Sequence, residues 1–125
     1  MDLNQITIPS MDLYRSVPFY QKLGLKLIVD SVPNYVRFEC PKGNSTFSIH
    51  HTNDLPSGEA IAIYFETEHL DDEVERLIRT GVKFDLLPTD QSWLWREARL
   101  RDPDGNRIIL YFGGKNRKNP PWRIS

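Results

Sequence analysis

The residues with the clearest capacity for chemistry gather in the segment 93–101. Apolar and polar residues alternate there, and in a strand this alternation places Trp95, Glu97 and Arg99 on one face. A guanidinium beside an indole can bind a planar anion, because it forms paired hydrogen bonds with carboxylate or phosphate and stacks on aromatic rings. Alternatively, Glu97 neutralises Arg99 in an internal ion pair. Trp93, in the preceding loop, could line the mouth of the same pocket.

A second group of candidates lies on other predicted strands. Ser48 and His50 share one face of their strand, where the imidazole could act as a general base or hydrogen-bond a ligand. The alternative is a partly exposed histidine at a strand end. Tyr64 and Tyr111 either pack as aromatics or line a pocket with their hydroxyls available for hydrogen bonds. His50 is thus the candidate general base, and the other three are candidate pocket residues.

Composition excludes several classes of partner and site. The chain has 125 residues, enough for one domain, with 39% hydrophobic and 26% charged residues. Its net charge of −1 does not attract nucleic acid or an anionic membrane surface. The single Cys40 cannot form an internal disulfide, and no cysteine cluster is present to hold zinc. The first ten residues lack the basic start and apolar run of a signal peptide, and no run of about 20 apolar residues is present, so we expect a cytoplasmic protein.

An internal repeat must position these candidates. Two segments with the apolar spacing of an amphipathic helix recur at an offset of 57 residues. Their apolar residues are Leu13, Val17 and Tyr20 in the first segment, and Leu70, Val74 and Leu77 in the second. Ser10 and Thr67 are the expected N-caps, and Gly24 and Gly81 suit the left-handed residue beyond each helix end. Pro18 lies within the first helix and predicts a kink or a late start.

Period-two alternation and turn signals predict strands around each helix. The expected strands are 3–8, 25–30, 35–40 and 46–50 in the first half, and 60–66, 82–86, 94–101 and 107–112 in the second. The turns at 41–44 and 103–106 correspond at an offset of 62, so five extra residues lie between Gly81 and Pro103. Each half then has the order strand, helix, three strands. We expect the halves to pack together as one domain, 1–125, with module 1 at about 1–54, module 2 at about 59–112 and a tail at 113–125.

Two sets of residues resemble a known family. Phe19-Tyr20 with Leu23-Gly24, and later Asp102-Pro103-Asp104-Gly105-Asn106, are similar to the paired βαβββ modules of the vicinal oxygen chelate superfamily. That superfamily includes glyoxalase I, extradiol dioxygenases, fosfomycin-resistance enzymes and bleomycin resistance proteins. The resemblance covers residues 3–112 and implies an α+β fold with a cupped eight-stranded mixed sheet and helices on its outer face. It also implies a homodimer, but it does not settle the activity.

The resemblance also implies a divalent metal, held by His and Glu on the concave sheet faces, which stabilises an enolate or activates a nucleophile or dioxygen. The corresponding positions here are Gln5, Ser48, Ala62 and Ile109. A shift of two residues in the alignment would replace Ser48 by His50. Two of the four positions have no ligating side chain, and glutamine and serine are poor transition-metal ligands. We therefore expect the family's metal site to be lost and predict no cofactor.

The hypothesis that follows is a protein that binds a small anionic or aromatic molecule in the cup without a catalytic metal. Its expected pocket residues are Gln5, Ser48, His50, Tyr64, Trp93, Trp95, Glu97, Arg99 and Tyr111. One alternative is a metal-dependent lyase or dioxygenase with a rearranged ligand set, for instance His50 with Gln5 and Glu97. A second alternative is a dimeric interaction module without a small ligand, in which the aromatic side chains fill the cup.

The tail at 113–125 lies beyond the repeat. Its two prolines stiffen an extended segment, and we expect Trp122 and Ile124 to dock on the domain or on a second subunit. Structural closure is the favoured role of the tail, and a ligand lid is the alternative.

Overall fold

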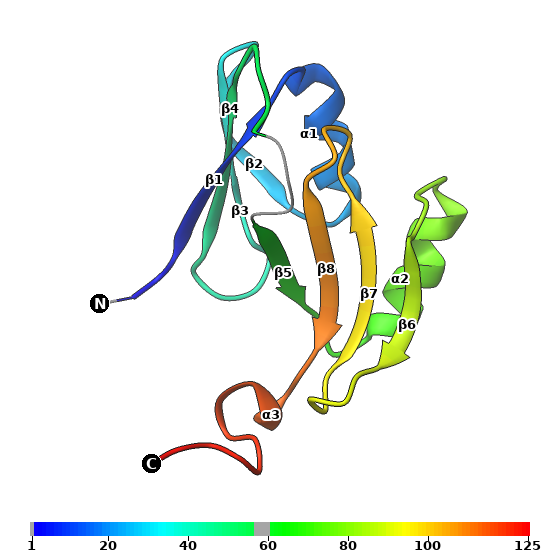
Figure 1. The fold of residues 1–125 in the computed structure, drawn as a ribbon. Helices are drawn as coiled ribbons and strands as arrows, with labels where there is room; N and C mark the ends of the chain where they lie inside the picture. The colour runs from blue at the N-terminus through cyan, green and yellow to red at the C-terminus, as the bar shows by residue number, and fades with distance from the viewer. Residues whose placement is uncertain (1, 57–60) are drawn as a thin grey trace. The chain divides into compact units, whose positions relative to one another are not determined.

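A computed structural model of the protein describes residues 2–56 and 61–125, which belong to two compact units, Met1–Gly58 and Glu59–Ser125 (Figure 1). Unit 1 contains β1 (Gln5–Ser10), α1 (Leu13–Lys22), β2 (Lys26–Ser31), β3 (Tyr35–Glu39) and β4 (Thr46–His51). Unit 2 contains β5 (Ala62–Glu66), α2 (Leu70–Arg79), β6 (Leu86–Asp90), β7 (Arg96–Arg101), β8 (Arg107–Phe112) and α3 (Lys115–Lys118). The predicted α+β class with two βαβββ modules is confirmed. Ala60, the expected start of the fifth strand, lies outside the described residues.

Each unit has one four-stranded mixed sheet. The strand order is β1-β4-β3-β2 in unit 1 and β5-β8-β7-β6 in unit 2. In both sheets the first strand of the module runs parallel to the last, and the other neighbours are antiparallel. The eight expected strands therefore form two sheets of four, and the last strand of each module lies in the interior of its sheet.

One face of each sheet packs against the helix of its own module. In unit 1, the ring of Tyr20 lies 6.1 Å from the ring of Phe38 and 4.7 Å from that of Phe47, which joins α1 to β3 and β4. In unit 2, α2 buries its predicted apolar stripe and contacts β6, β7 and β8. Because side chains alternate across a strand, the intervening residues lie on the opposite side, hereafter the helix-free face of each sheet.

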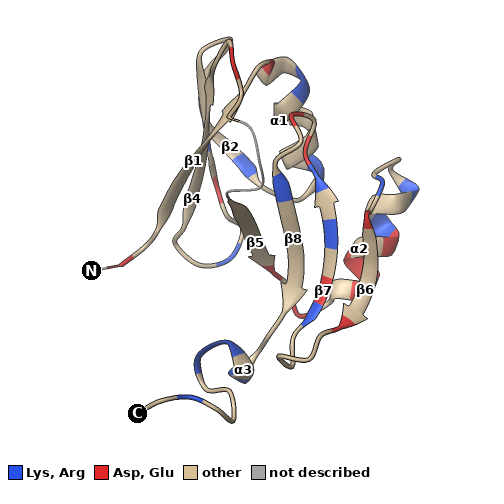
Figure 2. Cartoon of the chain, in the orientation of Figure 1, with Lys and Arg blue, Asp and Glu red and all other residues tan. Residues whose placement is uncertain are grey.

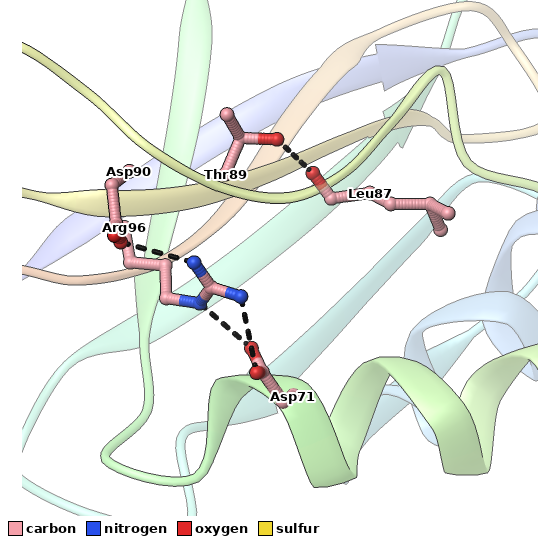
Figure 3. Close-up of polar contacts among 5 residues, drawn as sticks. All are labelled: Asp71, Leu87, Thr89, Asp90 and Arg96. Atoms are coloured by element: carbon pink, nitrogen blue, oxygen red, sulfur yellow. Dashed lines mark hydrogen bonds and ion pairs between the residues drawn. The ribbon is translucent and has the colours of Figure 1, made fainter.

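Arg96 shows which residues of β7 lie on the helix side (Figure 3). Its Nε and Nη2 donate to the two carboxylate oxygens of Asp71 on α2, at 2.9 and 3.1 Å, and its Nη1 donates to Asp90 of β6 at 3.0 Å. One guanidinium thus joins α2 to two strands. By alternation, Glu97 and Arg99 lie on the helix-free face.

The helix ends differ in part from the prediction. Gly24 and Gly81 have φ of +98° and +95° and follow the C-cap residue of each helix, as the sequence predicts. The N-caps are Asp12 and His69, not Ser10 and Thr67. Instead, the hydroxyls of Ser10 and Thr67 each accept a hydrogen bond from the backbone N–H of the N-cap residue, two positions later in the chain. The first helix continues through Pro18 and begins at Leu13, so a late start did not occur.

The extra residues of module 2 lie within β6 and in the turn that follows it. The strand expected at 82–86 begins only at Leu86, and its pairing with β7 shifts register between Leu86 and Thr89. The strand expected at 94–101 begins at Arg96, because residues 91–95 form a turn in which Leu94 has φ of +68°. No helix in the described ranges is long and apolar enough to cross a membrane.

Candidate functional site

In unit 1, the helix-free face of the sheet carries a chain of hydrogen bonds that crosses three strands. Gln5 of β1 donates from Nε2 to the Ser48 hydroxyl of β4 at 2.7 Å. The Ser48 oxygen lies 2.7 Å from the Tyr35 hydroxyl of β3, which also accepts from Arg37 Nε at 3.0 Å. Ser48 is fully buried, while Gln5 and Arg37 are exposed. The structure therefore brings together two of the four residues that the resemblance placed at the family's metal positions, and it adds Tyr35 and Arg37.

The position of Gln5 is fixed by further contacts. Its Nε2 also donates to the Ile6 carbonyl at 3.1 Å and to the Thr7 hydroxyl at 3.2 Å, and its Oε1 accepts from the Thr46 hydroxyl. Both ends of the amide therefore have partners on β1 and β4. The Gln5 side chain therefore acts as a hydrogen-bonding group that links β1 to β4 on the helix-free face.

The phenol of Tyr35 is made more acidic by this network. The hydrogen bond with Ser48 is the largest cause that lowers the pKa of Tyr35 below its ordinary value, and the hydrogen bond and charge of Arg37 lower it further. Burial opposes the effect only in part.

His50, the candidate general base, lies on the same helix-free face near the end of β4. It is paired with Pro9 of β1 and Tyr35 of β3 in the backbone register, and it is exposed. Within residues 2–56 and 61–125, the structure records no side-chain hydrogen bond for His50, whereas Ser48, two residues earlier, is at the centre of the network.

In unit 2, Glu97 is fully buried on the helix-free face of the sheet, and each of its carboxylate oxygens accepts a hydrogen bond. Its Oε2 accepts from Trp93 Nε1 at 2.8 Å, and its Oε1 accepts from Arg99 Nη2 at 3.2 Å. The geometry is that of the internal ion pair considered as the alternative for Arg99. However, Arg99 Nε is buried and has no hydrogen-bond partner in the described part of the chain. Figure 2 shows the basic residues of β7 and α3 in blue.

Three aromatic side chains pack on one another beside this pair. Trp95 is stacked on Tyr111 with ring centroids 4.7 Å apart, and Tyr64 makes edge contacts with both, at 5.9 and 5.4 Å. Tyr111 is buried, and burial is the main cause that raises the pKa of its hydroxyl. Tyr64 remains 46% exposed, so one ring of the cluster is accessible in this chain.

The start of the tail is attached to unit 2. Glu66 Oε2 accepts from the backbone N–H groups of Gly113 and Gly114, both at 3.0 Å, and Trp95 Nε1 donates to the Asn116 carbonyl at 3.2 Å. Trp122 and Ile124 are 57% and 87% exposed, so neither is buried by docking in this chain.

The strand registers show which positions of the two modules are equivalent. Gln5 pairs with Thr46 and Ala62 pairs with Arg107, so Ser48 corresponds to Ile109. This is the alignment that places Ser48, and not His50, at the family's metal position in the fourth strand. His50 corresponds to Tyr111 by the same registers.

Across β3–β4 and β7–β8, the registers likewise make Tyr35 equivalent to Glu97 and Arg37 equivalent to Arg99. Sequence reasoning missed Tyr35 and Arg37. The offset of 62 residues that matches the two turns also connects both residues to the candidates of module 2, and it was the signal that could have found them.

The residues at the family's metal positions do not fit a metal ion. Gln5 and Ser48 are bonded to each other, and their counterparts Ala62 and Ile109 have no ligating atom. Glu97, proposed for a rearranged ligand set, has both oxygens occupied by Trp93 and Arg99. In the described part of the chain, no group of three or more His, Cys, Asp or Glu could hold a metal ion.

Comparisons with known proteins agree with this fold. A family model described as Glyoxalase/Bleomycin resistance protein/Dioxygenase superfamily matches residues 2–110. Among solved structures, a glyoxalase/bleomycin resistance protein/dioxygenase from Nocardioides is 22% identical with a TM-score of 0.77, covering 100% of this chain and 90% of that one. A lactoylglutathione lyase from Agrobacterium tumefaciens is 17% identical with a TM-score of 0.74, covering 90% and 93%. No curated protein sequence matches the chain.

Proposed function

Since the chain belongs to the glyoxalase/bleomycin resistance protein/dioxygenase superfamily, we propose that it binds a small anionic or aromatic molecule on the helix-free faces of its modules, without the family's metal. The observation that carries the proposal is the bond between Gln5 and Ser48. Side chains at these positions are committed to a hydrogen-bonding network, which suits recognition of ligand oxygens better than coordination of a cation.

Unit 2 supports the same function. A buried donor without a partner costs about 1–3 kcal/mol, so the unpartnered Arg99 Nε favours a water or a ligand oxygen beside it. The exposed ring of Tyr64, next to Trp95 and Tyr111, offers an aromatic surface on which a ring of the ligand can stack. On this proposal, the ligand contacts are the residues expected from the sequence, each within its own module, together with Tyr35 and Arg37 on module 1, where His50 is a ligand contact or general base.

Two further features of the proposal follow from the sequence. We propose a homodimer, in which the exposed Trp122 and Ile124 dock on a second copy of the chain. We also propose a cytoplasmic location, as expected from the sequence.

The test combines metal analysis with ligand screening. Tag-free protein purified without chelator is soaked in Mn²⁺, Fe²⁺, Ni²⁺ or Zn²⁺, dialysed and analysed for bound metal, and then screened against small carboxylates, phosphates and neutral aromatics by thermal shift and calorimetry. We expect no stoichiometric metal and at least one bound molecule. Arg99→Ala should weaken binding of an anion by about 2 kcal/mol, the usual size of a hydrogen bond to a charged group. Arg79→Ala, on an exposed part of α2, is the matched control.

Two results would contradict the proposal. Near-stoichiometric metal that is lost in His50→Ala would point to lyase or dioxygenase chemistry with a rearranged ligand set. Failure of every anionic and neutral molecule to bind, in a protein that is folded, would favour the interaction module.

A further inference from the structure

The proton arrangement around Ser48 follows from its neighbours. Gln5 Nε2 lies 3.1 Å from the Ile6 carbonyl, an oxygen that can only accept, so the amide nitrogen points toward Ile6 and Ser48. Ser48 therefore accepts a hydrogen bond from Gln5. Its own single proton needs an acceptor, because the side chain is fully buried.

The acceptor for that proton is Tyr35. The Tyr35 oxygen lies 2.7 Å from Ser48 Oγ, and the structure records no other acceptor for Ser48 within residues 2–56 and 61–125. The reverse direction, with Tyr35 donating to Ser48, would leave a buried serine proton unsatisfied. Ser48 therefore donates to Tyr35.

Tyr35 is then left with a proton to donate. Its oxygen accepts from Ser48 and from Arg37 Nε, so both lone pairs are engaged and the O–H is free. In the described part of the chain this proton has no recorded acceptor. The side chain is only partly buried, so a ligand can reach it.

Arg37 supplies a charge beside this donor. Its guanidinium carbon lies 5.6 Å from the centroid of the Tyr35 ring, and the side chain is exposed. No ion pair is recorded for Arg37 among the described residues, and Glu39, two residues along the strand, instead pairs with Lys26 at 3.7 Å. Arg37 therefore keeps its positive charge and its terminal nitrogens available for an anion.

We propose that Tyr35 and Arg37 form an oxyanion-binding pair, in which the Tyr35 hydroxyl and the terminal nitrogens of Arg37 donate to the same carboxylate, enolate or phosphate group of the ligand. This inference rests on the proposed function and specifies it: the ligand is an oxyanion, and its charged group lies on module 1. In the equivalent pair on module 2, Glu97 neutralises the charge of Arg99, so Arg99 can donate a hydrogen bond to an anion through Nε but supplies no uncompensated positive charge.

The experiment is a calorimetric titration of the full-length protein. The probes are acetate, benzoate, oxalate and phenyl phosphate, with benzamide and benzyl alcohol as uncharged controls. We expect an oxyanion to bind more tightly than its uncharged counterpart. Arg37→Gln should weaken its binding by about tenfold or more, and Tyr35→Phe by about fivefold to tenfold, the usual effect of losing a charge-assisted hydrogen bond. Arg37→Lys should retain part of the affinity, and Lys42→Gln, in the exposed β3–β4 turn, should change nothing.

A second measurement separates contact with the anion from a merely structural role. The pKa of Tyr35 is obtained from the ultraviolet difference between wild type and Tyr35→Phe during an alkaline titration. A bound oxyanion should raise this pKa, because a neighbouring negative charge disfavours the phenolate. Circular dichroism establishes that each variant is folded.

The outcomes distinguish the inference from the proposed function. If an oxyanion binds with unchanged affinity in Arg37→Gln and Tyr35→Phe but weakens in Arg99→Ala, the inference is wrong and the proposed function stands. The same holds if only the uncharged aromatics bind. If nothing binds, both fail.

Discussion

Arg37 and Arg99 occupy equivalent positions in the two modules, yet they differ in their charge partners. Arg37 lies opposite Ser48 across β3–β4 and donates to the hydroxyl of Tyr35. Arg99 lies opposite Ile109 across β7–β8 and donates to the carboxylate of Glu97. The repeat thus places a guanidinium at the same point of each helix-free face, and a Tyr or Glu two residues earlier decides whether its charge is available.

Removing the buried carboxylate should free the charge of Arg99. In Glu97→Gln, one oxygen acceptor remains for Trp93 or Arg99, but not both, and the guanidinium loses its counter-charge. We expect a loss of about 1–3 kcal/mol in the free energy of unfolding, measured in urea. Any oxyanion that contacts Arg99 should bind more tightly in this variant. Glu68→Gln, on an exposed position, is the control, and equal stability of the two variants would contradict the buried pair.

The Ser48 hydroxyl should control the acidity of Tyr35. Ser48→Ala removes the donor that contributes most to the lowered pKa of the phenol, while the Arg37 contact remains. The pKa of Tyr35 should therefore rise toward its ordinary value in an alkaline titration followed by tyrosinate absorbance. Stability should fall by about 1 kcal/mol, the usual net value of one hydrogen bond. Ser45→Ala, in an exposed loop, should leave both quantities as they are, and an unshifted titration in Ser48→Ala would refute the network.

The ion pair between Asp71 and Arg96 should make the stability of unit 2 dependent on acid. The hydrogen bond from Arg96 is the largest cause that lowers the pKa of Asp71 in the folded protein. A carboxyl whose folded pKa is depressed stabilises the fold fully above its unfolded pKa, about 4, and loses that stabilisation as pH falls through the folded value. Asp71→Asn should therefore lower the thermal midpoint at neutral pH and become indistinguishable from wild type in strong acid. Because the pair is exposed, the difference should be small and should shrink in high salt.

The control is Arg79→Gln, which changes a charge on α2 without a recorded ion pair in the described residues. A deficit for Asp71→Asn that persists unchanged from neutral pH into acid would show that the loss comes from helix packing or capping and not from the ion pair.

The internal repeat made most of the fold predictable, whereas the exact ends of the helices and strands were predicted less well. The positive-φ glycines Gly24 and Gly81 follow from spacing alone, because few other residues adopt that conformation. Ser10 and Thr67 are misleading as N-caps, because a hydroxyl can accept from the N–H two residues on in a turn as well as at a helix start. β6 begins only at Leu86 and shifts register against β7 between Leu86 and Thr89, and period-two alternation encodes neither feature.

In the candidate site, too, some residues could be predicted from the sequence pattern and others could not. Alternation alone placed Glu97 and Arg99 on the face where the structure has them, because the side-chain period of a strand is fixed. Tyr35 was missed because its role depends on a contact with Ser48 across strands, and because the offset of 62 residues that links it to Glu97 was applied only to the turns. Which partner neutralises an arginine is a question of three-dimensional contacts.

The attachment of the tail should depend on the absence of a side chain at Gly113. A Cβ built there would lie 3.0 Å from Trp95 Nε1 and 3.1 Å from Cδ1, closer than ordinary packing allows. In Gly113→Ala the indole must move, and its hydrogen bond to the Asn116 carbonyl and its stacking on Tyr111 should weaken. We expect a loss of about 1–3 kcal/mol in stability, as for overpacking in a core. Trp95→Phe removes the five-membered ring that contains the atoms in conflict, so in its presence Gly113→Ala should cost much less. Strictly additive losses in this double-mutant cycle would show that the two residues do not interact.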